Sequence, residues 1–168
     1  MDRRTIKTFA AILIVSAVTA LNLSAQTRND VITAFNDGAK TMQTDVKASI
    51  EAFEKAVLLA GQVGESADDL KQKAVQALPG LYVKLAANTL TEKKPAEETI
   101  KASKNALAAA EKYNNAASRE SASKLLAQGY YNLGVGFYTK KDYENALKSF
   151  DSVLTNNPAF LNAIYNKA

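Results

Sequence analysis

The spacing of apolar and small residues between positions 127 and 160 constrains the fold of this chain more than any other feature. Apolar side chains stand three and four positions apart in the first part of this segment, and small or apolar ones do the same in its second part. The two sets are Tyr130, Leu133 and Phe137, and then Ala146, Phe150 and Val153. Side chains with this spacing share one face of an α-helix, so the segment predicts two helices that each bury one side.

A polar turn separates these two predicted helices, and a proline ends the second one. The turn is residues 139–142, where the carboxylate of Asp142 can accept a hydrogen bond from the first N–H groups of the second helix. Pro158 ends that helix, because the residue before a proline avoids the α conformation. Gly134 and Ala146 are small where the two helices must approach closely. The segment therefore predicts an antiparallel helical hairpin.

This spacing resembles the tetratricopeptide repeat (TPR), a hairpin of about 34 residues with an aromatic residue, Leu-Gly, a second aromatic, Ala-x3-Phe and a closing Pro. The matching residues are Tyr130, Leu133, Gly134, Phe137, Ala146, Phe150 and Pro158. The resemblance implies an all-α fold, in which antiparallel helical hairpins stack into an α-solenoid. It also implies a protein that holds other proteins and is not an enzyme.

Weaker copies of the hairpin precede this best repeat. Gly38, Ala86 and Gly134 are evenly spaced along the chain, and a second helical pattern follows each of them. We therefore expect degenerate hairpins over about 28–63 and 66–113. The expected helices are 28–43, 46–62, 66–91, 96–113 and 118–139.

The third of these helices carries both a start signal and an interruption. Ser66 is a candidate N-cap, and Asp68 and Asp69 follow it where acidic side chains favour the helix dipole. Pro79 falls inside the same helix, directly before Gly80. Proline removes a main-chain hydrogen bond and clashes with the preceding turn, so the sequence predicts a kink or a short break there.

Residues 161–168 resemble the start of another repeat. Asn166 lies one TPR length after Asn132, and Ala168 lies one TPR length after Gly134. The sequence stops inside this expected helix without the polar cap that terminal repeats normally carry. We therefore expect a solenoid truncated at its C-terminus, either as a fragment of a longer protein or as one whose open end another chain covers.

Residues 1–25 have the layout of a secretory signal peptide. A basic start precedes an apolar run over residues 9–21, and small residues lead to Ala25. The run is shorter than the roughly 20 residues that span a bilayer. Cleavage after Ala25 or Gln26 would leave a repeat domain of residues 27–168 with no membrane span, periplasmic or secreted; an uncleaved anchor is the alternative. The absence of cysteine excludes a lipid-anchored lipoprotein. The cleavage region resembles that of exported repeat proteins of the Bacteroidota.

Composition argues against most catalytic and nucleic-acid functions. The chain has no histidine and no cysteine, which removes the commonest general base, thiolate nucleophiles and most zinc sites. The net charge of +4 falls to +2 without the signal segment, and no basic stripe with interleaved aromatics is present. We therefore expect no catalytic, cofactor-binding or metal-binding residue, and no nucleic-acid partner.

The first helix of each repeat is expected to form an inner face that receives a protein or peptide. Asn36, Asn132 and Asn166 recur at the same place, and Lys84 takes that place in the second unit. An asparagine amide both donates and accepts, so a ladder of them can hold a peptide backbone. The candidate peptide-binding residues are Asn132, Asn166, Asn36, Tyr131, Gln128, Val135 and Tyr138. The alternative is that these asparagines only face water.

These observations favour a non-catalytic exported scaffold that binds a protein or peptide partner in the cell envelope. One alternative is a structural subunit that assembles into a homo-oligomer through its open C-terminal end. Another is a binding module of a longer protein with an enzyme domain beyond residue 168. On the favoured hypothesis, Asn132→Ala weakens capture of the partner without unfolding the protein.

Overall fold

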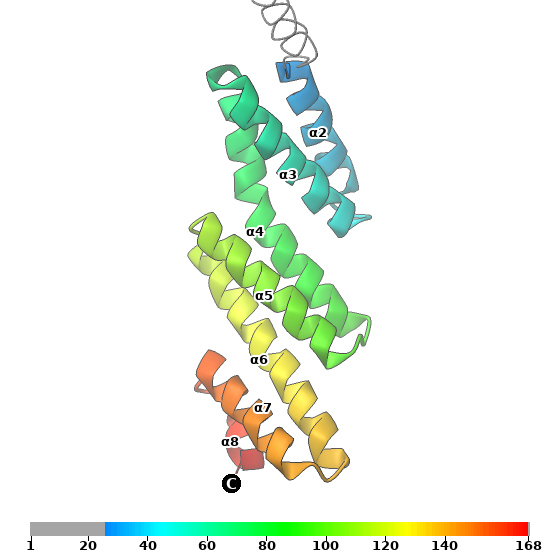
Figure 1. Ribbon diagram of the computed structural model, residues 1–168, viewed down its shortest axis with the longest axis vertical. Helices are drawn as coiled ribbons and strands as arrows, with labels where there is room; N and C mark the ends of the chain where they lie inside the picture. The colour runs from blue at the N-terminus through cyan, green and yellow to red at the C-terminus, as the bar shows by residue number, and fades with distance from the viewer. Residues whose placement is uncertain (1–25, 168) are drawn as a thin grey trace, which may run out of the picture.

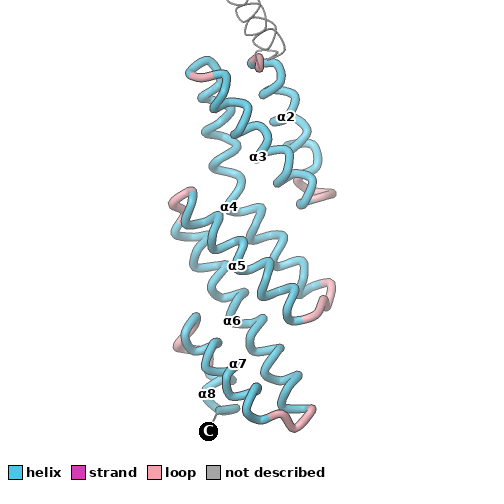
Figure 2. Tube along the Cα trace, viewed as in Figure 1, coloured by secondary structure: helices cyan, strands magenta, loops and turns pink. Residues whose placement is uncertain are grey.

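The computed structural model describes residues 26–167, which form α-helices joined by short turns and contain no β-strand (Figures 1 and 2). The elements are α2 (Arg28–Thr41), α3 (Val46–Val63), the 3-10 turn η1 (Glu65–Ala67), α4 (Asp68–Thr91), α5 (Ala96–Lys112), α6 (Ala116–Thr139), α7 (Tyr143–Asn156) and α8 (Leu161–Lys167). The predicted all-α class is confirmed. The predicted signal peptide, residues 1–25, lies outside the described residues.

The helices follow one another along the long axis of the molecule (Figure 1). Each packs beside the next one in sequence, so that α2 and α3, α4 and α5, and α6 and α7 form three antiparallel hairpins. α8 lies beside α7, and α4 also touches both α2 and α6. Within the described residues, none of the helices is both long and apolar enough to cross a membrane.

Three of the turns between helices close in the same way. Lys93, Asn114 and Lys141 each have a positive φ, of 52°, 50° and 62°. The N–H group of the next residue then bonds to a carbonyl in the last turn of the preceding helix: Lys94 to Thr89, Asn115 to Ala110 and Asp142 to Phe137, at 2.8, 2.8 and 3.0 Å. This left-handed closure ends a helix while satisfying its last carbonyl groups, and it turns the chain back for the next helix.

The predicted cap at Asp142 is confirmed, whereas the one at Ser66 is wrong. The carboxylate of Asp142 accepts from the N–H group of Asn145 at the start of α7. At α4, the chain enters through η1, so Ala67 stands at the cap position and offers no side-chain acceptor. The carbonyl of Ser66 instead accepts from the guanidinium of Arg28, which also binds Asp69 at 2.7 Å.

Pro79 bends α4 without breaking it. The helix runs continuously from Asp68 to Thr91, so the predicted short break is absent. Figure 1 shows its axis changing direction near the middle, as the predicted kink requires. The side chain of Pro79 is fully buried, which holds the bend inside the packed part of the molecule.

Buried side chains form three clusters along the chain. The N-terminal cluster joins α2, α3 and the first part of α4 and includes Phe53 and Leu78. The middle cluster consists of Ala86, Ala106 and Ala122. The C-terminal cluster consists of Ala127, Ala146, Phe150, Val153 and Ala163. The helices of the last hairpin cross so closely that a Cβ atom on Gly134 would lie 2.7 Å from the Phe150 ring, which confirms the predicted contact of Gly134 with the helix that carries Ala146.

Candidate binding surface

An aromatic hollow lies beside the last hairpin, between α6, α7 and α8. It measures about 530 Å³. Its lining residues are Tyr131, Val135 and Tyr138 from α6, Phe150 from α7, and Tyr165 and Asn166 from α8. The first three stand four and then three positions apart, so they share one side of α6. The hollow therefore exists only where three different helices meet.

The floor of the aromatic hollow is held in place by ring packing. The Tyr131 ring lies 6.0 Å from that of Phe150 and 5.2 Å from that of Phe160, measured between centroids. Phe150 is only 1% exposed, because its ring fits against the bare backbone of Gly134. The hydroxyl of Tyr131 accepts a hydrogen bond from the side-chain amide of Asn166 at 3.3 Å. These contacts join α6, α7 and α8 beside the hollow.

The rim of the aromatic hollow is exposed. Tyr138 is 57% exposed and Tyr165 is 78% exposed. The Tyr138 ring also meets the ring of Tyr143 edge to face, at a centroid distance of 5.6 Å. Among the described residues that line the hollow, tyrosine is the only ionisable type. The surface thus offers aromatic faces, phenol hydroxyls and one amide, which suit an uncharged segment with both apolar and hydrogen-bonding groups.

The structure brings four of the seven predicted binding residues together in this hollow. They are Tyr131, Val135, Tyr138 and Asn166. Tyr165, which the prediction missed, completes the set. Its signal was present in the sequence, because Tyr165 lies one TPR length after Tyr131, as Asn166 does after Asn132.

The other three predicted residues lie elsewhere. The side-chain amide of Gln128 donates to that of Asn132 at 2.9 Å. Asn132 lines a separate hollow of about 260 Å³, beside Ala96 and Glu97 at the start of α5. Asn36 is exposed on α2. Because Asn132 and Asn166 line different hollows, the three asparagines do not form a row along one described cavity.

The contacts of Lys84 suggest what this repeated position does. Its ammonium donates to the carbonyl of Met42 at 3.1 Å and to the side chain of Gln43 at 3.0 Å. Both acceptors lie in the turn between α2 and α3. Asn132 faces the start of α5, just after the next such turn. Lys84 therefore contacts the turn of the preceding hairpin, whereas Asn132 shares a hollow with residues that follow such a turn.

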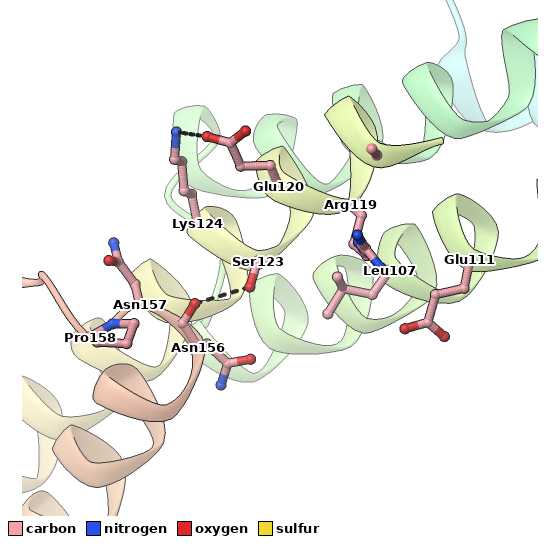
Figure 3. Close-up of a pocket in the computed structure, with 10 residues that line it drawn as sticks. Leu107, Glu111, Arg119, Glu120, Ser123, Lys124, Asn156, Asn157 and Pro158 are labelled. Carbon is pink, nitrogen blue, oxygen red and sulfur yellow. Dashed lines mark hydrogen bonds and ion pairs between the residues drawn. The ribbon is translucent and has the colours of Figure 1, made fainter. Parts of the chain in front are cut away.

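A larger hollow of about 670 Å³ lies between α5, the start of α6 and the end of α7 (Figure 3). Several of its polar groups already have partners. Figure 3 shows Lys124 directed to Glu120, at 2.6 Å, and the hydroxyl of Ser123 directed to the carbonyl of Asn156, at 3.0 Å. A ligand would have to compete with these contacts, so this hollow is a weaker candidate than the aromatic one.

Exposed large apolar residues gather at the same end of the molecule as the aromatic hollow. Seven of the eight in the described structure lie at or after Val135, and only Leu58 lies elsewhere. Beyond the hollow, they include Leu147 on α7 and Leu161 and Ile164 on α8, which we call the C-terminal apolar face. Exposed apolar groups that gather in this way mark interaction sites more often than isolated ones do.

Comparison of the chain with protein-family models, with curated proteins and with solved structures gave no match. Within residues 26–167, no three acidic side chains come together as ligands for a metal ion. The groups gathered at the aromatic hollow can stack on a partner and hydrogen-bond to it. The functional assignment therefore rests on this geometry and on the spacing of the repeats.

Proposed function

We propose that this protein is a non-catalytic scaffold that binds a protein or peptide partner through the aromatic hollow. One observation carries the proposal: exposed Tyr138 and Tyr165 line a hollow together with Tyr131, whose ring packs against Phe150 and Phe160. Tyrosine contributes large contact area and a hydroxyl at low entropic cost, which is why it is enriched at the centres of interfaces.

The scaffold in this proposal is an α-solenoid of TPR-like hairpins. The close crossings of the first and last hairpins support it, because Gly38 lies against Phe53 as Gly134 lies against Phe150. The contacts of α4 with both α2 and α6 also support it, because stacked hairpins bring their first helices side by side. The spacing of the best repeat, residues 127–160, agrees with both observations.

We place the working protein in the cell envelope, after removal of residues 1–25. The basic start, the apolar run and the small residues before Ala25 support export. The partner is then an envelope protein or an exported peptide. N-terminal sequencing of the protein recovered from cells tests the removal of residues 1–25. An intact Met1 would contradict that removal and favour the uncleaved anchor.

A binding assay with matched variants tests the aromatic hollow. Overlapping peptides from envelope proteins of the source organism would be screened against the purified full-length protein by fluorescence polarisation. We expect Tyr138→Ala and Tyr165→Ala to lower the affinity for a specifically bound peptide by about tenfold or more, as truncation of aromatic anchors does. Leu58→Ala is the control, because Leu58 is equally accessible, at 64% exposed, but lies on α3. Equal affinity in all variants would reject the hollow as the site.

The predicted role of the asparagines is tested in the same assay. Asn166→Ala removes the amide that holds the hydroxyl of Tyr131, whereas Asn132→Ala removes one that faces the start of α5. If the hollow is the site, Asn166→Ala weakens binding more than Asn132→Ala. The reverse order would restore the original hypothesis that Asn132 holds the peptide.

The C-terminal apolar face favours self-assembly as a second candidate function. Leu161 and Ile164 are 66% and 45% exposed and stand one turn apart on α8. If this face joins two copies, the mass measured by light scattering rises with protein concentration, and Leu161→Asp abolishes the rise. A mass that stays that of one chain at all concentrations would leave partner binding as the better explanation.

A further inference from the structure

The middle of α4 combines two residues that weaken a helix. Pro79 has no N–H group to offer the carbonyl of Val75, four residues earlier, so one main-chain hydrogen bond is missing. Gly80 follows it and is exposed, and a Cβ atom built on Gly80 would meet nothing within 4 Å. No close packing requires a glycine there. Its effect is to leave the backbone freer than alanine would.

α4 changes its packing partners over the turns that follow this point. Ala74 and Leu78 belong to the N-terminal cluster with α2 and α3, whereas Ala86 belongs to the middle cluster with α5 and α6. Leu81 still packs in the N-terminal cluster, and Tyr82 and Leu85 pack against it, so the exchange takes place over the two turns that follow Gly80. In the described structure, α3 and α5, which flank α4, make no extensive contact with each other. α4 is thus the main link between the first hairpin and the helices that follow.

A hollow of about 320 Å³ separates α3 from α5 beside this link. Glu54 of α3 lies on one side of it, and Asn105 and Lys112 of α5 lie on the other. Tyr82 of α4 lines the same hollow, and its hydroxyl donates to a carboxylate oxygen of Glu54 at 2.7 Å, which joins α4 to α3. Partial burial and this hydrogen bond to a carboxylate raise the pKa of Tyr82 above its usual value, so the phenol keeps the proton that it donates.

From this geometry we propose that α4 is a hinge at Pro79–Gly80 and that the Tyr82–Glu54 hydrogen bond is its latch. Bending at Gly80 changes the separation of α3 and α5 across the hollow between them. The contact of Lys84 with the carbonyl of Met42 joins α4 to the turn just before α3. The hinge lets the first hairpin swing while the aromatic hollow on α6, α7 and α8 keeps its shape, so the proposal does not depend on what the hollow binds.

Distance measurement between two spin labels tests the hinge. The chain has no cysteine, so Lys55→Cys on α3 and Lys101→Cys on α5 give two unique attachment points in the purified full-length protein. Pulsed electron paramagnetic resonance then gives the distribution of distances between α3 and α5. We expect a broad distribution in the parent protein and a narrower one when Gly80→Ala is added, because alanine restricts the backbone at the hinge.

Gly61→Ala is the matched control for this experiment. Gly61 is also an exposed helical glycine with nothing within 4 Å of a built Cβ, but it lies near the end of α3. If α4 is a hinge, Gly61→Ala leaves the width of the distance distribution between α3 and α5 unchanged. A parent distribution as narrow as that of Gly80→Ala overturns the proposal, and so does equal narrowing by both substitutions.

The latch is tested separately with Tyr82→Phe. This variant keeps the ring and removes only the hydroxyl that reaches Glu54, so the hydrogen bond between α4 and α3 is lost. We expect the distance distribution to widen beyond that of the parent. An unchanged width in Tyr82→Phe overturns the latch, and a width unchanged by Gly80→Ala overturns the hinge, so the two parts fail independently.

Discussion

The middle hairpin is built differently from the two outer ones at the place where its helices cross. In the outer hairpins a glycine meets a phenylalanine ring: a Cβ atom on Gly38 would lie 3.0 Å from Phe53, and one on Gly134 would lie 2.7 Å from Phe150. In the middle hairpin Ala86 and Ser103 take the corresponding places, and both are fully buried. In each outer hairpin, therefore, a glycine on the first helix leaves the space that a phenylalanine ring on the second helix fills. The middle hairpin has neither the glycine nor the ring at this place.

Hydroxyl groups also lie at the crossing of the middle hairpin. The hydroxyls of Thr99 and Thr89 are 2.8 Å apart, and that of Thr89 donates to the carbonyl of Ala86 at 2.6 Å. Ser103 lies nearby in sequence, and its buried hydroxyl has no hydrogen-bond partner within residues 26–167. The middle cluster has three alanines as its buried apolar residues. Removing a side chain should therefore have opposite effects in the outer and the middle hairpins.

Phe150→Ala should have the largest effect, because it empties the crossing of the last hairpin. Truncating a buried phenylalanine to alanine costs about 3–5 kcal/mol of unfolding free energy, from lost burial and the remaining cavity. Phe53→Ala should behave alike, since Phe53 is also 1% exposed. Urea denaturation followed by circular dichroism measures both losses, and a small loss in either variant would show that its crossing does not depend on the ring.

Gly134→Ala should have an intermediate effect, by adding volume to the last crossing. The new Cβ atom would lie 2.7 Å from Phe150, so the ring or the helix must move. Overpacking of this kind costs about 1–3 kcal/mol. Gly136→Ala on the same helix meets nothing within 4 Å and should gain up to about 1 kcal/mol. Thermal denaturation measures both changes. If the melting temperatures of the two variants shift in the same direction, the close contact between Gly134 and Phe150 does not determine the effect.

Ser103→Ala is the matched truncation in the middle hairpin. It removes a buried hydroxyl that lacks a partner, so the unfolding free energy should rise by about 1 kcal/mol in urea denaturation. A loss of stability in Ser103→Ala would show that the hydroxyl has a partner after all, such as a buried water molecule. The outer and middle hairpins would then differ only in the volumes of the side chains at their crossings.

The sequence was enough to predict the hairpins because their determinants are local. The spacing of Tyr130, Leu133 and Phe137, the cap at Asp142 and the bend at Pro79 each depend on residues within a few turns. The contact of Gly134 with the last hairpin's second helix followed from the same spacing. These are the features that the structure confirms.

The aromatic hollow could be predicted only in part, because it depends on how three helices meet. Spacing placed Tyr131, Val135 and Tyr138 on one side of α6, but it did not show that Tyr165 would join them from α8. The asparagines were expected to share one face, but Asn132 and Asn166 line different hollows, and Lys84 contacts the turn before α3. Gly129 was also missed: a Cβ atom on it would lie 2.9 Å from Ile100, which no spacing within α6 indicates.

The junctions on either side of the middle hairpin differ in charge, which gives the smallest predicted effect. Between the first and middle hairpins, the guanidinium of Arg28 binds Asp69 at 2.7 and 3.0 Å. Between the middle and last hairpins, the ammonium of Lys104 lies over the ring of Tyr130, 5.8 Å from its centroid. Only the first of these contacts depends on a carboxylate. Acid should therefore weaken the first junction and leave the second unaffected.

The pKa of Asp69 sets the range in which acid acts. The hydrogen bonds from Arg28 lower the pKa of Asp69 to about 2, from an ordinary value of about 3.9 in an unfolded chain. The pair therefore stabilises the fold fully above about pH 4, and this contribution is lost as the pH falls towards 2. The loss should be small, because both side chains are largely exposed.

Melting temperatures measured from pH 5 to pH 2 test this difference between the junctions. They should fall less steeply for Asp69→Asn than for the parent, because the variant has already lost the carboxylate that acid would neutralise. Asp68→Asn, which changes the neighbouring acid with no ion pair in the described structure, should follow the parent. If Asp69→Asn keeps the parent's slope, the acid sensitivity lies elsewhere, and the two junctions do not differ in the way that their charges indicate.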